Sequence, residues 1–252
     1  MKLYCRQIGE GHPVVILHGL FGMSDNWLTI AKQLSKSHHC YILDMRNHGR
    51  SPKSPDLNYD DMVEDVYEFL TDFDLRTVSI IGHSMGGMVA MKFAFEYSHR
   101  IEKLVIVDIA PKSYPALHQN ILEGLKSIPI EEIKSRKEAH KSLKEYVLSK
   151  KTRQFLLKNL YRKENNTYAW RANLDAITDH ALDIGRGIST NLIYEKPTLF
   201  IRGEKSEYLL PEDKSRVLEL FPLAIFIEIP GASHWVHAEN PDEVFAALKS
   251  FL

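Results

Sequence analysis

The chain is poor in cysteine and has no long hydrophobic run. It has two cysteines, Cys5 and Cys40, in 252 residues, and neither belongs to a metal-binding pattern, so both suit a reducing compartment. The longest apolar runs, such as Pro13 to Leu17, are strand-sized and too short to span a bilayer. The first eleven residues contain no apolar core of signal-peptide length. We therefore expect a cytoplasmic protein that does not bind membranes.

The charges of the chain nearly cancel. The formal net charge is −1, so we expect no partner among nucleic acids. The length fits one large α/β domain with an insertion. One stretch departs from the balance: residues 126–163 carry 12 Lys or Arg and 4 Glu, a net charge of 12 − 4 = +8. These charges are either solvated helix faces or a surface that attracts an anionic substrate.

Short apolar runs alternate with amphipathic stretches along much of the chain. This alternation predicts a mostly parallel sheet covered by helices on both faces. The site of such a sheet lies at the carboxyl ends of its strands. The runs expected as strands are Val14–Leu17, Cys40–Leu43, Val78–Ile81, Leu104–Val107, Thr198–Ile201 and Ile225–Ile229, and the stretches expected as helices include Trp27–Leu34 and Met62–Phe73.

Helical patterns replace this alternation over residues 112–195. Examples are Ala116–Leu125, Ile130–Leu148 and Arg153–Leu160. No Pro/Gly/Ser-rich linker flanks the segment, so it is expected to pack on the sheet rather than move as a tethered domain. We call it the cap insertion, and predict a core made of residues 1–111 and 196–252.

The strongest chemical signal is Gly82-His83-Ser84-Met85-Gly86, which follows an apolar strand pattern and precedes a helical one. A serine at a tight strand-to-helix corner needs neighbours without side chains, and the two glycines meet that need. Ser84 is therefore the predicted nucleophile. The alternative is a chance match in a glycine-containing turn.

A serine hydroxyl needs a neighbouring base, which is most often histidine. His234 lies in a glycine-bearing loop after the last predicted strand, and Asn240-Pro241-Asp242-Glu243 then predicts a capped helix start. His18 is expected to order its own loop, and no third ligand accompanies His234 and His237 in a metal site. Surface or packing roles are expected for His38, His39, His99, His118, His140 and His180.

An oxyanion hole needs two backbone N–H donors. One is predicted at Met85, directly after the nucleophile. The other is predicted in the loop His18–Gly22, at Leu20 with Phe21 as the alternative, unless this is an ordinary glycine turn. Phe21, His83 and Trp235 adjoin these positions in the sequence and are predicted to bind substrate.

With these motifs the chain resembles the α/β-hydrolase superfamily over its full length, and more narrowly the YbfF-like acyl esterases. The resemblance implies an α/β-hydrolase fold and hydrolysis of acyl esters or thioesters, acyl-CoA among them, through a serine acyl-enzyme without a cofactor. The segments that carry it are His18–Gly22, Asp44–Gly49 with Ser51-Pro52, Gly82–Gly87, Val107–Pro111 and Gly231–Glu239.

The sequence offers more than one carboxylate as the acid that would orient His234. The superfamily often has Asp where this chain has Ser206, and the narrower group has it one strand earlier, where Asp108 lies. Asp108 is preferred because it ends a buried strand, although it could be a structural cap at the start of the insertion. The other candidates are Glu204, Glu207 and Asp183.

Other functions remain open at this point. The same fold carries carbon–carbon hydrolases, lyases and haloperoxidases, and a receptor of low turnover could keep the same residues. Acyl chain length, leaving group and oligomeric state do not follow from the sequence.

Overall fold

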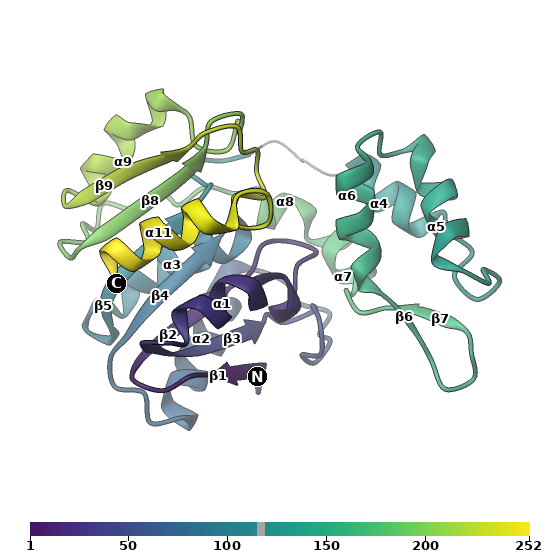
Figure 1. The fold of residues 1–252 in the computed structure, drawn as a ribbon, viewed down its shortest axis with the longest axis horizontal. Coiled ribbons are helices and arrows are strands. Elements are labelled where there is room, and N and C mark those ends of the chain that lie inside the picture. Colours follow the sequence, from purple (N-terminus) through teal and green to yellow (C-terminus); the bar gives the residue numbers. More distant parts are fainter. Residues whose placement is uncertain (115–118) are drawn as a thin grey trace.

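The computed structural model describes residues 1–114 and 119–252. Its centre is a seven-stranded sheet of order β1-β3-β2-β4-β5-β8-β9, in which β1 pairs antiparallel with β3 and every other pair is parallel (Figure 1). The strands are β1 (Tyr4–Ile8), β2 (His12–Leu17), β3 (His38–Asp44), β4 (Val78–His83), β5 (Ile101–Val107), β8 (Thr198–Gly203) and β9 (Ala224–Ile229). The predicted mostly parallel α/β fold and its six strands are confirmed. β1 was not predicted, because its sequence mixes polar and apolar residues.

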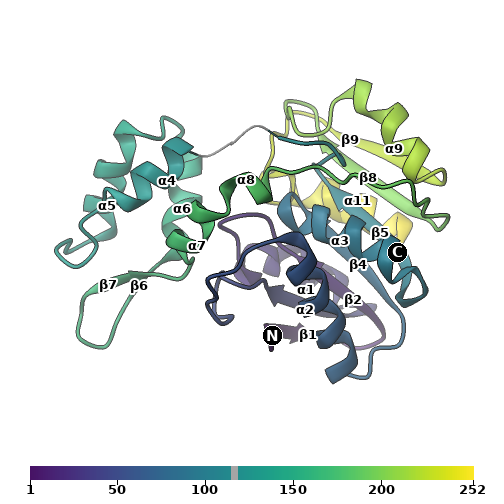
Figure 2. The same cartoon turned by 180° about the vertical axis from the view of Figure 1, so that it is seen from behind.

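Helices cover both faces of the sheet, as the opposite views in Figures 1 and 2 show. α1 (Leu28–Leu34), the short α10 (Val236–Glu239) and α11 (Pro241–Phe251) pack on one face, and α2 (Tyr59–Asp72), α3 (Met85–Glu96) and α9 (Lys214–Leu220) pack on the other. Val14 and Ile16 of β2 belong to the first core, whereas Val15 and Leu17 belong to the second. Successive side chains of a strand point to opposite faces of the sheet, so in a strand buried on both faces every side chain enters a core. Burial of one such apolar side chain contributes about 1.5–3 kcal/mol of transfer free energy.

The segment between β5 and β8 lies beside the carboxyl end of the sheet. It contains α4 (Gln119–Lys126), α5 (Arg136–Ser142), α6 (Lys150–Leu156), α7 (Leu174–Asp179), α8 (Ala181–Ile184) and a hairpin of β6 (Leu160–Arg162) and β7 (Tyr168–Trp170). The helix predicted over 130–148 is much shorter, because Ser135 caps α5 by accepting a hydrogen bond from Glu138 N–H. The hairpin was not predicted. Ala116, the start of the predicted helix 116–125, and His118 lie outside the described residues.

Hydrogen bonds fix the cap insertion to the sheet side. The Asn159 side chain donates to the backbone carbonyl of Phe21 at 2.7 Å, and the Asn173 side chain donates to the side-chain Oδ1 of Asn47 at 3.0 Å. The Tyr59 hydroxyl, on α2, donates to the Ile184 carbonyl at 2.7 Å. The insertion is therefore held at several separate points.

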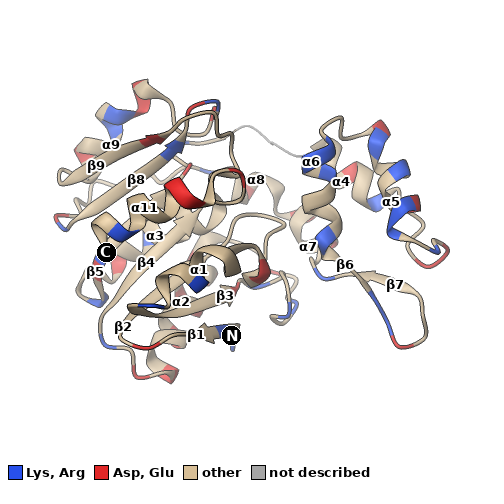
Figure 3. Ribbon diagram, in the orientation of Figure 1, with Lys and Arg blue, Asp and Glu red and all other residues tan. Residues whose placement is uncertain are grey.

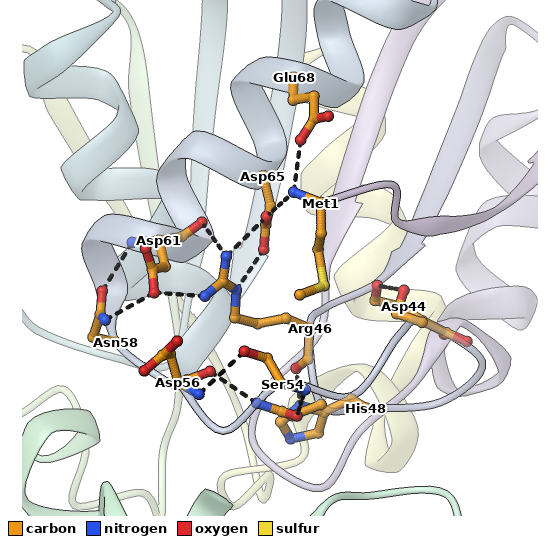
Figure 4. Close-up of polar contacts among 12 residues, drawn as sticks. Met1, Asp44, Arg46, His48, Ser54, Asp56, Asn58, Asp61, Asp65 and Glu68 are labelled. Carbon is orange, nitrogen blue, oxygen red and sulfur yellow. Dashed lines mark hydrogen bonds and ion pairs between the residues drawn. The ribbon is translucent and has the colours of Figure 1, made fainter.

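The loop after β3 is fastened to α2 through Arg46. Its guanidinium donates to Asp65 at 2.6 and 3.0 Å and to Asp61 at 2.6 Å, and the amino group of Met1 bonds to Asp65 and Glu68 (Figure 4). Arg46 and Asp65 are both buried, so each compensates for the desolvation of the other. This network holds the loop that carries His48, whose ring centroid lies 5.2 Å from that of His18.

The predicted capped start of the last helix is partly wrong. Asn240 is the residue before α11 and Pro241 is its first residue, but the Asn240 side chain accepts no hydrogen bond from the helix. Instead its amide donates to the Pro230 carbonyl at 3.0 Å. A tertiary contact therefore replaces the local cap.

Candidate active site

Ser84 lies at the corner between β4 and α3, in a strained backbone conformation with φ +52°. Its N–H donates to the Val107 carbonyl, and its own carbonyl accepts from Gly87 and Met88. A Cβ on Gly86 would collide with the carbonyls of Leu17 and His18 in the neighbouring strand. The glycine therefore permits the close approach that the sequence motif predicts.

Two side chains from distant parts of the chain form a hydrogen-bonded series that begins at the Ser84 hydroxyl. His234 Nε2 lies 3.0 Å from Ser84 Oγ, and His234 Nδ1 lies 2.7 Å from Asp108 Oδ2. The Asp108 carboxylate is fully buried, so His234 Nδ1 carries the proton and Nε2 is the acceptor for the serine hydroxyl. This tautomer leaves Nε2 able to take a proton from Ser84.

Asp108 follows β5 with φ +54°, and three groups bond to its carboxylate. Gly203 N–H donates to Oδ1 at 2.9 Å, and the Ser206 hydroxyl and His234 Nδ1–H both donate to Oδ2. Ser206, at the position where the sequence comparison with the wider superfamily leads one to expect Asp, here donates to the carboxylate of Asp108.

The competing carboxylates have other partners. Glu204 is exposed and accepts from Gly231 N–H at 2.6 Å, and Glu207 is exposed. Asp183 pairs with His180 at 3.0 Å and with Arg186 at 3.6 Å. Asp108 is therefore the candidate acid that the structure brings to His234.

Tyr208 stacks on the imidazole of His234. The ring centroids are 3.7 Å apart and the planes meet at 19°. Burial raises the pKa of Tyr208 to about 12, so its phenol stays neutral against the imidazole. Sequence reasoning missed this residue because a lone Tyr in a loop carries no motif.

His83 is hydrogen-bonded to the backbone of His234. Its Nε2 lies 2.9 Å from the His234 carbonyl, to which it donates, and burial lowers the pKa of His83 well below the usual value. The His237 ring stacks on Trp27 with 4.3 Å between centroids, and burial lowers the pKa of His237 to about 3. Both imidazoles are therefore neutral, and Nε2 of His83 carries its proton.

The loop His18–Gly22 lies directly against Ser84. Gly22 N–H bonds to the Gly19 carbonyl, and a Cβ on Gly19 would come within 3.0 Å of Ser84 Cβ. His18 Nδ1 donates to the Gly19 carbonyl while its Nε2 accepts from Met45 N–H, so His18 orders the loop as predicted. Within the described ranges, neither Leu20 nor Met85 donates its N–H to another protein group.

Two cavities meet at Ser84, and both are also lined by Leu20 and Tyr208. The smaller has a volume of about 50 Å³ and is walled by apolar side chains and, besides Tyr208, two more tyrosines; its lining includes Met88, Ile109, Leu122, Ile177, Tyr59 and Tyr114. The larger has a volume of about 230 Å³ and contains His234, with aromatic walls that include Phe21, Trp27, Phe155 and Trp235. The predicted substrate residues Phe21, His83 and Trp235 all line the larger cavity.

Comparison with known proteins places the chain in a family. A family model described as alpha/beta hydrolase fold matches residues 12–241. The sn-1-specific diacylglycerol lipase ABHD11 of Danio rerio is 39% identical over 97% of this chain and 79% of the relative. Esterase YbfF of Escherichia coli (strain K12) is 36% identical over 95% of this chain and 92% of the relative.

Solved structures agree with these relatives. A marine microorganism esterase superimposes with a TM-score of 0.97 at 41% identity, covering 100% of this chain and 99% of the other. The resemblance to the YbfF-like esterases that the motifs indicate is thereby confirmed. The chain belongs to the α/β-hydrolase fold family.

Proposed function

We propose that this protein is a serine esterase and thioesterase that hydrolyses short- to medium-chain acyl esters. The single observation that carries the proposal is the continuous chain of contacts from Ser84 Oγ through His234 to Asp108, at 3.0 and 2.7 Å. Relatives at 36–41% identity that are named as esterases or a lipase support ester bonds as the target.

In the proposed mechanism, Ser84 Oγ attacks the carbonyl carbon of the ester while His234 Nε2 takes its proton. The oxygen of the tetrahedral intermediate accepts hydrogen bonds from the N–H groups of Leu20 and Met85. Collapse breaks the bond to the leaving group, which receives the proton from His234. Water then attacks the acyl-enzyme with His234 again as base. Asp108 holds the imidazole in one tautomer and stabilises its charged form.

The proposed organisation is a core of residues 1–111 and 196–252 with residues 112–195 as a cap over the site. In its support, Phe155 and Leu156 of α6 line the larger cavity and Ile177 of α7 lines the smaller. Asn159 also bonds to the loop proposed to hold the oxyanion. The cap insertion thus contributes walls to both cavities.

An anionic leaving group such as coenzyme A is the finer part of the proposal. Many Lys and Arg residues lie on the helices α4, α5 and α6 of the cap insertion (Figure 3). Lys151 lies 3.9 Å from Glu239, and Lys158 is close enough to lower the pKa of buried His237. These cations therefore lie near the His234 side of the site.

The proposed location is the cytoplasm. The two cysteines are free, and burial raises the pKa of both thiols to about 12, so neither is poised for oxidation. None of the described helices combines the length and apolar content that a bilayer crossing requires.

Turnover of a p-nitrophenyl short-chain ester tests the proposal. An esterase releases many equivalents of p-nitrophenol, and a fluorophosphonate that blocks it labels Ser84 alone. Release of about one equivalent would indicate a receptor of low turnover instead. Labelling at another residue with full loss of activity would assign the nucleophile elsewhere.

A further inference from the structure

The two cavities at Ser84 differ in one residue that matters for chemistry. His234 lines the larger cavity and does not appear in the wall of the smaller one. Met85, a proposed oxyanion donor, lines the smaller cavity. Ser84 lines both. The nucleophile therefore sits at a junction whose two branches are chemically unequal.

The direction of proton transfer decides which branch holds which half of the ester. His234 must deliver its proton to the leaving atom, so that atom lies within hydrogen-bond reach of Nε2. The acyl chain must point away from it, past the oxyanion donors. We propose that the small cavity holds the acyl chain and the large cavity holds the leaving group, an inference that rests on the proposed esterase function.

The size of the small cavity limits the acyl chain. Its volume of about 50 Å³, against about 230 Å³ for the large cavity, makes it the tighter of the two branches. We therefore expect short acyl groups to fit best and medium chains to be accepted less well.

The walls also select for an uncharged chain. No charged side chain of the described residues lines the small cavity. The Tyr59 hydroxyl is bonded to the Ile184 carbonyl at 2.7 Å, and the Tyr114 hydroxyl to the Tyr208 carbonyl at 2.5 Å. Both hydroxyl groups therefore donate to backbone carbonyls, and the two tyrosines present their apolar rings to the cavity. A carboxylate on the acyl chain would lose its hydration there without gaining a hydrogen-bond donor from these two tyrosines.

The large cavity fits a bulky leaving group. It has more than four times the volume of the small one and aromatic walls built by Trp27, Phe155 and Trp235. Phe155 and Trp235 pack on each other with 5.2 Å between ring centroids. A flat or branched apolar alcohol or thiol half gains most contact there.

Two substitutions in α8 test the assignment in opposite directions. Ile184→Ala enlarges the small cavity and Ala181→Leu fills it. Each is measured with p-nitrophenyl acetate, butyrate, hexanoate and octanoate, which share one leaving group. In the unmodified protein kcat/KM should fall at least tenfold from butyrate to hexanoate. Ile184→Ala should raise the hexanoate-to-butyrate ratio about tenfold, and Ala181→Leu should lower the butyrate-to-acetate ratio similarly.

Phe155→Ala is the matched variant in the large cavity. It should change the ratio of 2-naphthyl acetate to ethyl acetate hydrolysis and leave the acyl-length ratios unchanged. Thermal unfolding checks each variant, and because the two α8 substitutions act oppositely, misfolding of one leaves the other as the test.

The inference is overturned if octanoate is the best substrate of the unmodified protein. It is also overturned if Ile184→Ala alters only the leaving-group ratio. Failure of the proposed function looks different, because then no ester in either series is turned over.

Discussion

Ser206 donates a hydrogen bond to the carboxylate of Asp108, on the same oxygen that accepts from His234. The two residues come from the loops after β8 and β5, which are neighbouring strands of the sheet. Both side chains are buried. The position at which the wider superfamily often carries its acid is therefore in direct contact with the residue proposed to replace it.

This contact predicts that the acid can be exchanged between the two positions. Asp108→Ser should lower kcat by roughly 10³–10⁴, and adding Ser206→Asp should recover at least tenfold, because the new carboxylate starts beside His234 Nδ1. Steady-state kinetics of the single and double variants measure the recovery. Ser206→Asp alone supplies the control, and a double variant no better than Asp108→Ser would contradict the prediction.

Asp108→Asn should lower kcat by roughly 10³–10⁴, because the amide cannot hold the imidazole in the required tautomer. The matched variants Glu204→Gln and Glu207→Gln should each change kcat less than about tenfold, since neither carboxylate contacts His234 in the structure. The same ester assay ranks all three. If Asp108→Asn left kcat nearly unchanged and one of the two Glu variants were inactive, the acid would instead be the glutamate in the loop after β8.

Ser84→Ala should abolish ester hydrolysis, with a loss of kcat on the order of 10⁶, while the fold stays intact. Unfolding curves of both proteins check the fold. Ser98→Ala, at the exposed start of a short 3-10 helix, controls for the loss of a serine. Retention of a tenth of the activity by Ser84→Ala would rule out the proposed nucleophile.

The buried imidazoles make stability depend on acid. Burial lowers the pKa of His18 from 6.5 to about 4, and those of His48 and His237 to about 3. Below about pH 6.5 these three histidines are protonated in the unfolded chain but remain neutral in the folded chain. The free energy of unfolding should therefore be constant near pH 7 and fall as the pH drops toward 4, by about 1.4 kcal/mol per pH unit for each histidine.

Urea unfolding at pH 7, 6 and 5 measures this slope. His237→Phe keeps a ring for stacking on Trp27 and removes one titrating group, so it should flatten the slope between pH 6 and 5 by about 1.4 kcal/mol per unit. His99→Gln, at an exposed position, should leave it unchanged. An unchanged slope in His237→Phe would show that His237 does not titrate as its burial implies.

The basic cap insertion predicts a salt effect that depends on substrate. If its cations draw in an anionic leaving group, kcat/KM for an acyl-CoA should fall with added salt more steeply than for a neutral ester. Lys158→Glu should weaken the acyl-CoA reaction selectively, with Lys32→Glu, on α1 outside the cap insertion, as the matched charge reversal. Equal salt dependence for both substrates would assign these charges to solvation alone.

Local patterns in the sequence determined much of this protein. Apolar runs predicted six of the seven sheet strands, and the runs of the inner strands are largely apolar because both faces of those strands are buried. The elbow at Ser84 was readable because its glycines and its serine lie within five residues. β1 escaped prediction because its sequence mixes polar and apolar residues, and β6 and β7 escaped because each is only three residues long.

Only the tertiary structure decided which groups meet. The sequence left four carboxylates in contention for the acid, and the sheet order β5-β8-β9 brings Asp108 to His234, 126 residues away. The same strand order places Ser206 on Asp108 and Tyr208 on the imidazole, contacts that no motif records. Hydrophobic period and turn chemistry act over a few residues and can be read from the chain. Pairing of distant strands depends on how the whole sheet closes, and so becomes visible only in the folded molecule.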